Sequence, residues 1–152
     1  MGMSLAEAMV ANSREPGKGG AELESDSIEM KVGGEMQKVD FYWYGNLSAV
    51  EASAVVAFFT PTLNTDAKGK QTAVEGWTPD VPGAVREIFL RCIRNADGSR
   101  MFSDLDRQSV SNSFNWADVR RVVMHTGLLA KAMGSDESAL DAIEGVEETK
   151  NG

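Results

Sequence analysis

The sequence predicts a mixed α+β protein that is mainly helical, with a small N-terminal β-hairpin packed on about four helices. Apolar residues alternate with polar ones on both sides of a Gly-Gly pair, and farther along the chain they recur at helical spacing. With 152 residues, 42% of them hydrophobic and 25% charged, the chain has the size and composition of one globular domain.

The chain divides into three parts. Residues 1–27 hold a short apolar stripe followed by Pro16 and several glycines, which indicates a flexible N-terminal segment. Residues 28–145 carry the alternating and helical patterns and form the predicted domain. Residues 146–152 form an acidic C-terminal tail, a composition that is typical of solvated chain.

A β-hairpin is predicted around Gly33 and Gly34. A two-residue turn at this pair places Ile28 opposite Val39, so the apolar rows of the two strands share one face. The same alternation places Trp43 in the core. Because a two-stranded hairpin is marginally stable alone, we expect helices beneath it.

The next segment predicts a helix that begins at Ser48. Ser48 and Glu51 have the spacing of a capping box, in which the serine side chain accepts from a free amide and the glutamate reaches back to the cap. Pro61 ends this helix. Residues 61–80 then form a long, turn-rich segment with Leu63 as one of its few anchors, and both a functional loop and a surface insertion are open interpretations.

Further helices follow from apolar periodicity and from capping residues. Asn115 is the N-cap and Gly134 the stop signal of the last long helix. The predicted helical segments are residues 81–93, 103–111, 115–134 and 135–143.

Residues 91–104, "RCIRNADGSRMFSD", have the composition of a binding loop. If Gly98 were the sixth residue of a calcium loop, an isoleucine would occupy the first position, where a carboxylate is required. Phosphate-binding glycine motifs do not occur in the sequence. The pattern therefore predicts a turn at Asp97 and Gly98, a buried Phe102, and Ser103 as the cap of the next helix.

Catalytic and metal-binding patterns are not found in the sequence. The single histidine, His125, and the single cysteine, Cys92, have no ligand spacing around them, and the apolar run around Cys92 indicates a buried, inert thiol. We therefore predict no enzymatic activity, no cofactor and no metal. A net charge of −8 argues against nucleic acid, and the chain has neither an apolar run of membrane-spanning length nor a signal peptide at its start.

The stretch "VREIFLRCIRNADGSRMFSDLDRQSV" resembles the tail assembly chaperones of long-tailed (siphovirus-like) bacteriophages, which carry a segment like "DxDGxxLFSDxD". Here Asn95 replaces an acidic residue and Met101 replaces leucine. "YGNLSAVEASAVV" is similar to the family's "LSxxE" helix start, and "NWADVRRVVMHTGLLAKAMG" to its terminal helix, without the asparagine usual there. The resemblance covers residues 28–145.

The resemblance implies a non-enzymatic protein of the host bacterial cytoplasm that is not expected in the mature virion. It implies that the protein binds the tape measure protein and helps to recruit tail tube subunits, while the N-terminal stripe leaves self-association open. The alternative is a virion structural protein, either a head–tail connector or a minor tail component. The residues carried over are structural motif positions, with no catalytic, cofactor or metal role: Ser48, Glu51, Asp97, Gly98, Phe102 and Ser103.

Overall fold

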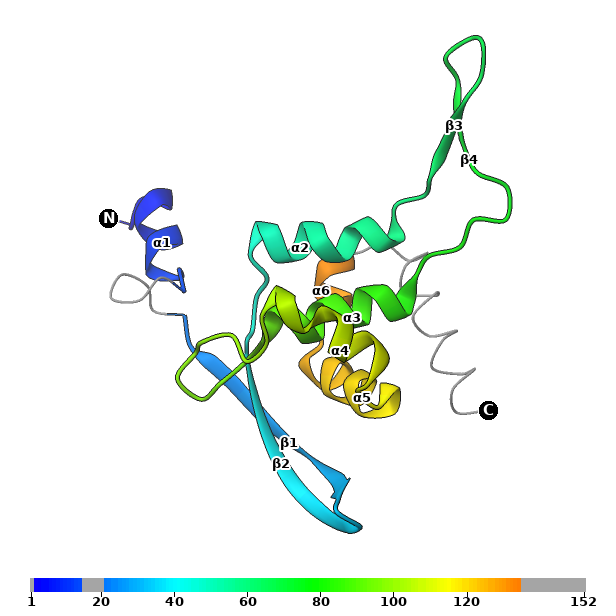
Figure 1. Ribbon diagram of the computed structural model, residues 1–152. Helices are drawn as coiled ribbons and strands as arrows, with labels where there is room; N and C mark the ends of the chain where they lie inside the picture. The colour runs from blue at the N-terminus through cyan, green and yellow to red at the C-terminus, as the bar shows by residue number, and fades with distance from the viewer. Residues whose placement is uncertain (1, 15–20, 135–152) are drawn as a thin grey trace.

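The computed structural model describes residues 2–14 and 21–134, and within these ranges the predicted mixture of helices and a small antiparallel sheet is confirmed. Figure 1 shows a helical body from which two hairpins extend in different directions. The predicted helix at 135–143 and the predicted tail at 146–152 lie outside the described residues.

The longer hairpin is formed by strands β1 (Leu23–Val32) and β2 (Glu35–Tyr44). Gly33 and Gly34 have φ angles of 59° and 88°, the left-handed values that a two-residue type I′ turn requires. Ile28 pairs with Val39, as predicted. The first strand begins at Leu23, inside the segment 1–27 that the sequence predicts to be flexible.

A third strand was not predicted. Strand β5 (Ile93–Arg94) pairs antiparallel with Tyr42 and Trp43, so the sheet has the order β1-β2-β5. The sequence predicts that the preceding helix continues through residue 93 into a turn. Instead Ile93 becomes extended, because pairing with β2 satisfies its backbone and its β-branched side chain stays in the core.

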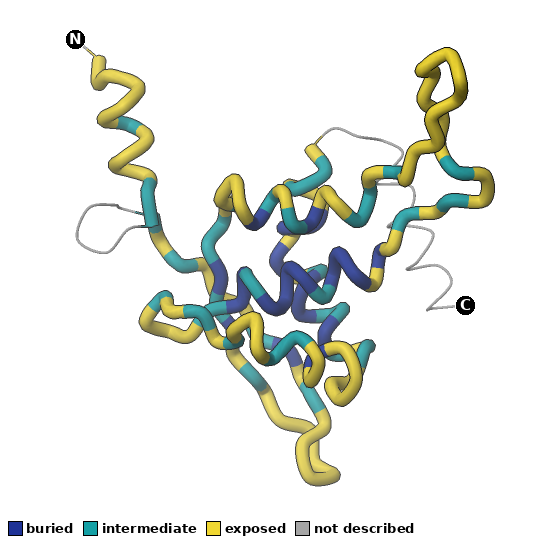
Figure 2. Tube along the Cα trace, turned by 45° about the horizontal axis from the view of Figure 1, so that its top comes forward, coloured by how far each residue is buried: buried dark blue, intermediate teal, exposed yellow. Residues whose placement is uncertain are grey.

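The helical body surrounds one central helix, α3, in which nine of twelve residues are buried. Phe41 and Trp43 of the hairpin belong to the same apolar core, which appears as the dark blue interior in Figure 2. The helical elements of this body are α2 (Ala49–Val56), η1 (Ala57–Phe59), α3 (Val81–Cys92), η2 (Asp104–Asp106), α4 (Arg107–Asn112), α5 (Trp116–Thr126) and α6 (Leu128–Met133).

The predicted helix over 115–134 is wrong in one respect, because it is two helices. Asn115 caps α5 as expected, but Gly127 adopts a left-handed φ of 67° and separates α5 from α6. The bend turns Leu128 and Leu129 into the core and leaves Ala130 exposed. Glycine is the residue that reaches this backbone region without strain, so a helix-ending glycine inside an apolar pattern was the missed signal.

Two parts of the chain lie outside the core. Helix α1 (Leu5–Ala11) is capped by Ser4 and buries none of its residues. The segment 61–80 contains a second, short hairpin of β3 (Leu63–Thr65) and β4 (Gln71–Ala73), in which every strand residue is exposed. Leu63 was expected to anchor this segment, yet 48% of its surface is exposed.

Candidate partner-binding site

The motif positions Ser48 and Glu51 form the predicted capping box. The Ser48 hydroxyl accepts from the Glu51 amide at 3.2 Å, and a Glu51 carboxylate oxygen accepts from the Ser48 amide at 3.0 Å. Glu51 is only 6% exposed, and its carboxylate also pairs with Arg14 at 2.7 Å and Arg94 at 3.0 Å. This residue therefore joins α2, β5 and the segment that follows α1.

Tyr44 adds to the same junction. Its ring lies 4.8 Å from the Arg14 guanidinium and 5.5 Å from the Arg94 guanidinium, distances at which a cation is attracted to an aromatic face. The two arginines that pair with Glu51 thus also contact β2. The arrangement satisfies its own charges, which indicates a structural role.

The turn at Asp97 and Gly98 is closed by its own hydrogen bonds. The Asp97 carboxylate accepts from the Ser99 hydroxyl at 2.5 Å and from the Ser99 amide at 2.9 Å, and these bonds lower the pKa of Asp97. Gly98 has a φ of 91°, and a Cβ atom there would lie 2.7 Å from the Tyr44 hydroxyl. The Asp97-Gly98 turn is therefore packed against the hairpin, with its carboxylate already occupied.

Ser103 and Phe102 also have structural partners. Ser103 begins η2 with a capping box, in which Asp106 accepts from the Ser103 amide at 2.7 Å. Phe102 stacks on Phe89 with ring centroids 5.1 Å apart and meets Phe114 edge-on at 5.5 Å. It was predicted to be buried but is only half-buried, because this aromatic cluster reaches the surface.

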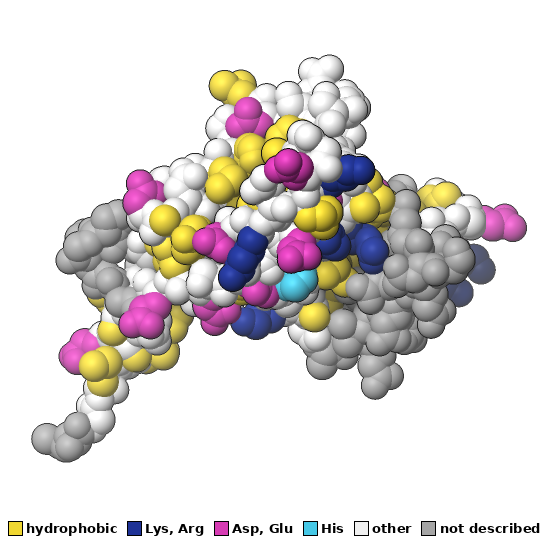
Figure 3. All heavy atoms as spheres, turned by 90° about the horizontal axis from the view of Figure 1, so that it is seen from below, with side chains coloured by type: hydrophobic (Ala, Val, Ile, Leu, Met, Phe, Trp, Pro, Cys, Tyr) yellow, Lys and Arg dark blue, Asp and Glu magenta, His cyan; other side chains and the backbone are white. Residues whose placement is uncertain are grey.

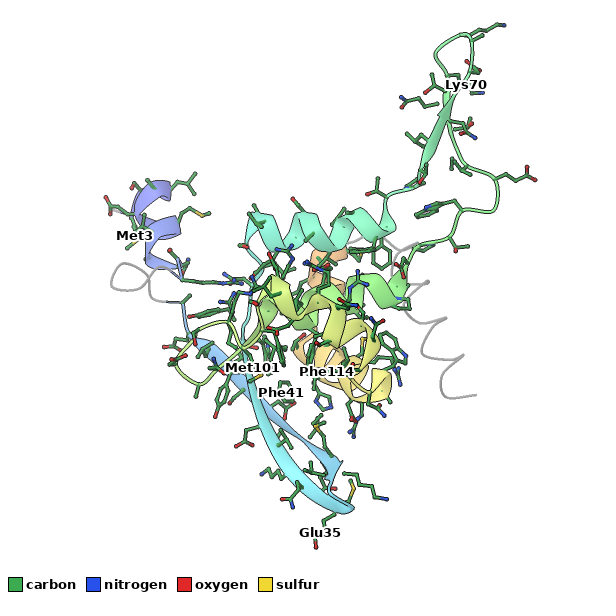
Figure 4. All side chains as sticks on the ribbon, in the orientation of Figure 1. Met3, Glu35, Phe41, Lys70, Met101 and Phe114 are labelled. Atoms are coloured by element: carbon green, nitrogen blue, oxygen red, sulfur yellow. The ribbon has the colours of Figure 1, made fainter. Side chains whose placement is uncertain are left out.

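An apolar pocket opens beside that aromatic cluster. It has a volume of about 360 Å³ and lies between the β1–β2 hairpin, α3, α5 and the turn after β5. Figure 4 shows Phe41, Met101 and Phe114 gathered at this junction, with Glu35 at the hairpin tip. The lining residues are Ile28, Met30, Val39, Asp40, Phe41, Phe89, Ile93, Met101, Phe114, Asn115, Asp118, Val119 and Val122.

The rim of the pocket is part apolar and part acidic. Met101 and Phe114 are each 41% exposed, and Asp40 and Asp118 supply carboxylates. Asp118 pairs with Arg121 at 3.0 Å, whereas no ion pair or hydrogen bond joins the Asp40 carboxylate to any residue in the described ranges. Such a site suits an apolar group that is accompanied by a positive charge.

This pocket is not predictable from the sequence, because its walls come from four elements far apart in the chain. One signal was present. The alternation of the hairpin continues through Met30, beyond the residues that a small core needs. Half-buried apolar residues beyond a filled core indicate a surface that another group can cover.

A second buried carboxylate, Glu87 of α3, is also fully paired. Burial is the largest single influence on the pKa of Glu87 and raises it. Hydrogen bonds from Arg107 and Arg91 together outweigh burial, so the pKa lies below its usual value. Glu87 Oε1 accepts from Arg107 Nε at 2.9 Å, and Glu87 Oε2 accepts from Arg91 Nε at 3.1 Å. This cluster ties α3 to α4.

Cys92 and His125 lie in different surroundings. Burial raises the pKa of the Cys92 thiol to about 12, which keeps it protonated and inert. His125 is exposed, and its Nδ1 lies 2.8 Å from an Asp26 carboxylate oxygen on β1. In the view from below, acidic and basic side chains lie next to exposed apolar ones on this face of the molecule (Figure 3).

Residues 2–14 and 21–134 contain no cluster of three or more His, Cys, Asp or Glu side chains that could hold a metal ion. None of the helices in the same ranges combines the length and the apolar character needed to cross a bilayer.

No family model matches this chain, and no curated protein or solved structure is similar enough to count as a match.

Proposed function

We propose that this protein is a phage tail assembly chaperone, which binds the tape measure protein and helps to recruit tail tube subunits during tail morphogenesis. The proposal rests first on the resemblance of the segment around Asp97, Gly98 and Phe102 to that family. The pocket between the hairpin and α5 is the observation that carries it further, because it is an apolar surface with no group of the described chain inside it.

The chemistry of the pocket suits temporary binding of another protein. Tail proteins that have not yet assembled expose apolar segments, and such segments aggregate unless they are covered. Met30 and Met101 line the pocket with flexible side chains that adapt to different apolar groups. The acidic rim and the net charge of −8 keep the chaperone itself in solution.

Affinity capture from infected host cells tests this function. A tagged copy, expressed at the natural level, is expected to enrich the tape measure and tail tube proteins, and to be missing from purified virions. Stoichiometric abundance in virions, with no enrichment of the tape measure protein, would contradict the proposal and favour a head–tail connector or a minor tail component.

A further inference from the structure

One edge of β2 is free beside the pocket. Strand β5 pairs only with Tyr42 and Trp43, so in the described ranges no strand lies next to the rest of β2 on that side. Val32 and Glu35, which flank the two-residue turn, form a hydrogen-bonded pair. Along an antiparallel ladder such pairs alternate with pairs whose backbone N–H and C=O groups point away from the partner strand. The backbone N–H and C=O groups of Met36, Lys38 and Asp40 therefore point to the free edge.

The pocket reaches this edge. Val39 and Phe41 line it with side chains from the core face of the hairpin. Strand alternation turns the side chain of Asp40 toward the opposite face, yet Asp40 also belongs to the lining. The pocket therefore extends to the edge of β2, where unpaired backbone groups stand next to an apolar cavity. On its other side the cavity is bounded by α5 residues such as Val119.

We propose that an extended segment of a partner protein adds to the sheet as a strand beside Met36–Asp40, and that it inserts apolar side chains into the pocket. Strand addition gives affinity through backbone hydrogen bonds, and pockets for alternate side chains give specificity. A bound helix would satisfy its own backbone and leave the edge groups of β2 unpaired. An extended chain satisfies both partners at once.

Charge selects the kind of segment. The Asp40 carboxylate has no partner in the described residues, and its cross-strand neighbour on β1 is Ser27. An added strand would place one outward-facing side chain beside Asp40 and the next beside Lys38, which lies on the same face. We therefore expect apolar residues that alternate with polar ones, with a Lys or Arg opposite Asp40. The C-terminal residues 135–150 carry six acidic residues against one lysine, which disfavours them as the occupant. Helix α1 of a second copy carries Glu7 and is not extended.

This inference rests on the proposed function, because it assigns a mode of binding to the same surface. Peptide selection on the purified full-length protein tests it. The probe is a library of random twelve-residue peptides. Enriched peptides are expected to alternate apolar and polar residues and to carry at least one Lys or Arg among the polar ones. On binding, the amides of Lys38 and Asp40 should become protected from hydrogen exchange. N-methylation of every second peptide residue should abolish binding, whereas methylation of the intervening residues should not.

A matched pair of proline variants locates the edge. Lys38→Pro removes an N–H that faces the pocket side, and it is expected to weaken the selected peptides at least about tenfold. Lys31→Pro places the same residue on the outer edge of β1, where the N–H also points away from the ladder, and binding should be unchanged. Circular dichroism checks that both variants fold. If Lys38→Pro does not fold, the methylation pattern decides alone.

Three results would overturn strand addition. They are enriched peptides with helical periodicity, enriched peptides that are acidic, and no enrichment relative to the library before selection. Dimers of the unaltered protein that do not form with Lys38→Pro would also contradict the proposal, because the strand that adds to β2 would then come from a second copy of this chain. Failure of peptide selection would leave the infected-cell capture unaffected. Success here without capture of tail proteins would reject the chaperone function while keeping the binding mode.

Discussion

The two hairpins of this protein begin from similar local sequence features and end in different structural roles. Both are antiparallel pairs joined by glycine-containing turns. At the base of the β1–β2 hairpin, Phe41 and Trp43 are buried in the core, whereas every strand residue of the β3–β4 hairpin is exposed. Large apolar side chains on one face, and not the turn, make the first hairpin part of the fold.

A further difference lies within the first hairpin itself. Its base is buried, while its outer half, including Val32 and Met36, is exposed. The pocket lies at the transition, where the alternating pattern continues but the helices beneath it end. The hairpin therefore completes the core at its base and carries, farther out, the β2 edge that we propose as a binding surface.

The largest effect is expected from truncation at the hairpin base. Trp43→Ala should lower the free energy of unfolding by about 3–5 kcal/mol, because it leaves a large cavity in the core. Leu63→Ala, the matched change in the β3–β4 hairpin, should stay within about 0.5 kcal/mol. Urea denaturation followed by far-ultraviolet circular dichroism, which does not depend on the tryptophan signal, measures the free energy of unfolding of both variants. Equal losses would show that the two hairpins contribute alike.

Removal of a carboxylate is expected to cost more stability beside the β1–β2 hairpin than in the β3–β4 hairpin. Glu51→Ala leaves Arg14 and Arg94 without their shared partner beside β2, and breaking such a buried pair costs about 3 kcal/mol. Asp66→Ala in the β3–β4 turn removes two surface hydrogen bonds from the Lys68 and Lys70 amides, and it should cost about 1 kcal/mol or less. Chemical denaturation of the two variants in parallel would contradict this order if Asp66 proved the more costly.

A matched pair of glycines gives a smaller difference. Gly98→Ala combines a left-handed φ with a Cβ that would meet the Tyr44 hydroxyl, and should cost about 2–3 kcal/mol. Gly69→Ala has a similar φ of 81° but nothing within 4 Å, so only the backbone strain of about 1 kcal/mol remains. Thermal denaturation distinguishes them. Equal shifts in Tm would mean that the contact with β2 is not tight.

The smallest effect belongs to the surface pair of Asp26 and His125, which joins β1 to α5. The hydrogen bond with His125 is the main cause that lowers the pKa of Asp26 below 3.8 in the folded protein. A lowered folded pKa stabilises the protein above the unfolded pKa, and this stability is lost as the pH falls through the folded value. Asp26→Asn should therefore lower Tm slightly at about pH 6, and the difference should narrow toward about pH 3. A difference in Tm between Asp26→Asn and the unaltered protein that grows as the pH falls would contradict this prediction.

Local features were predictable from the sequence, whereas features made by distant residues were not. The capping box at Ser48, the N-cap at Ser103 and the strand register set by the Gly33-Gly34 turn depend on residues within a few positions, and all are present. Strand β5 depends on β2, about fifty residues earlier, and a two-residue strand has no periodicity of its own. The left-handed Gly127 had a local signal that helical periodicity on both sides concealed.

The candidate site was the least predictable part for the same reason. The motif around Asp97 and Gly98 has the composition of a ligand loop, yet its hydrogen bonds are internal and its glycine packs on Tyr44. Met101 is the motif position that does reach the pocket, where it lines the same cavity as Val39 and Phe114 only after folding. The segment marks the family resemblance, and the neighbouring pocket is where we place the binding.

The most direct test is the solubility of the tape measure protein when it is co-expressed with variants of this chain. Met101→Glu places a charge at the pocket rim, and Leu63→Glu places the same charge on the β3–β4 hairpin; both positions are exposed, so both variants should fold. We predict that the unaltered protein and Leu63→Glu keep the tape measure protein soluble, and that Met101→Glu lets it aggregate. Equal solubility with all three proteins, or aggregation only with Leu63→Glu, would contradict the account.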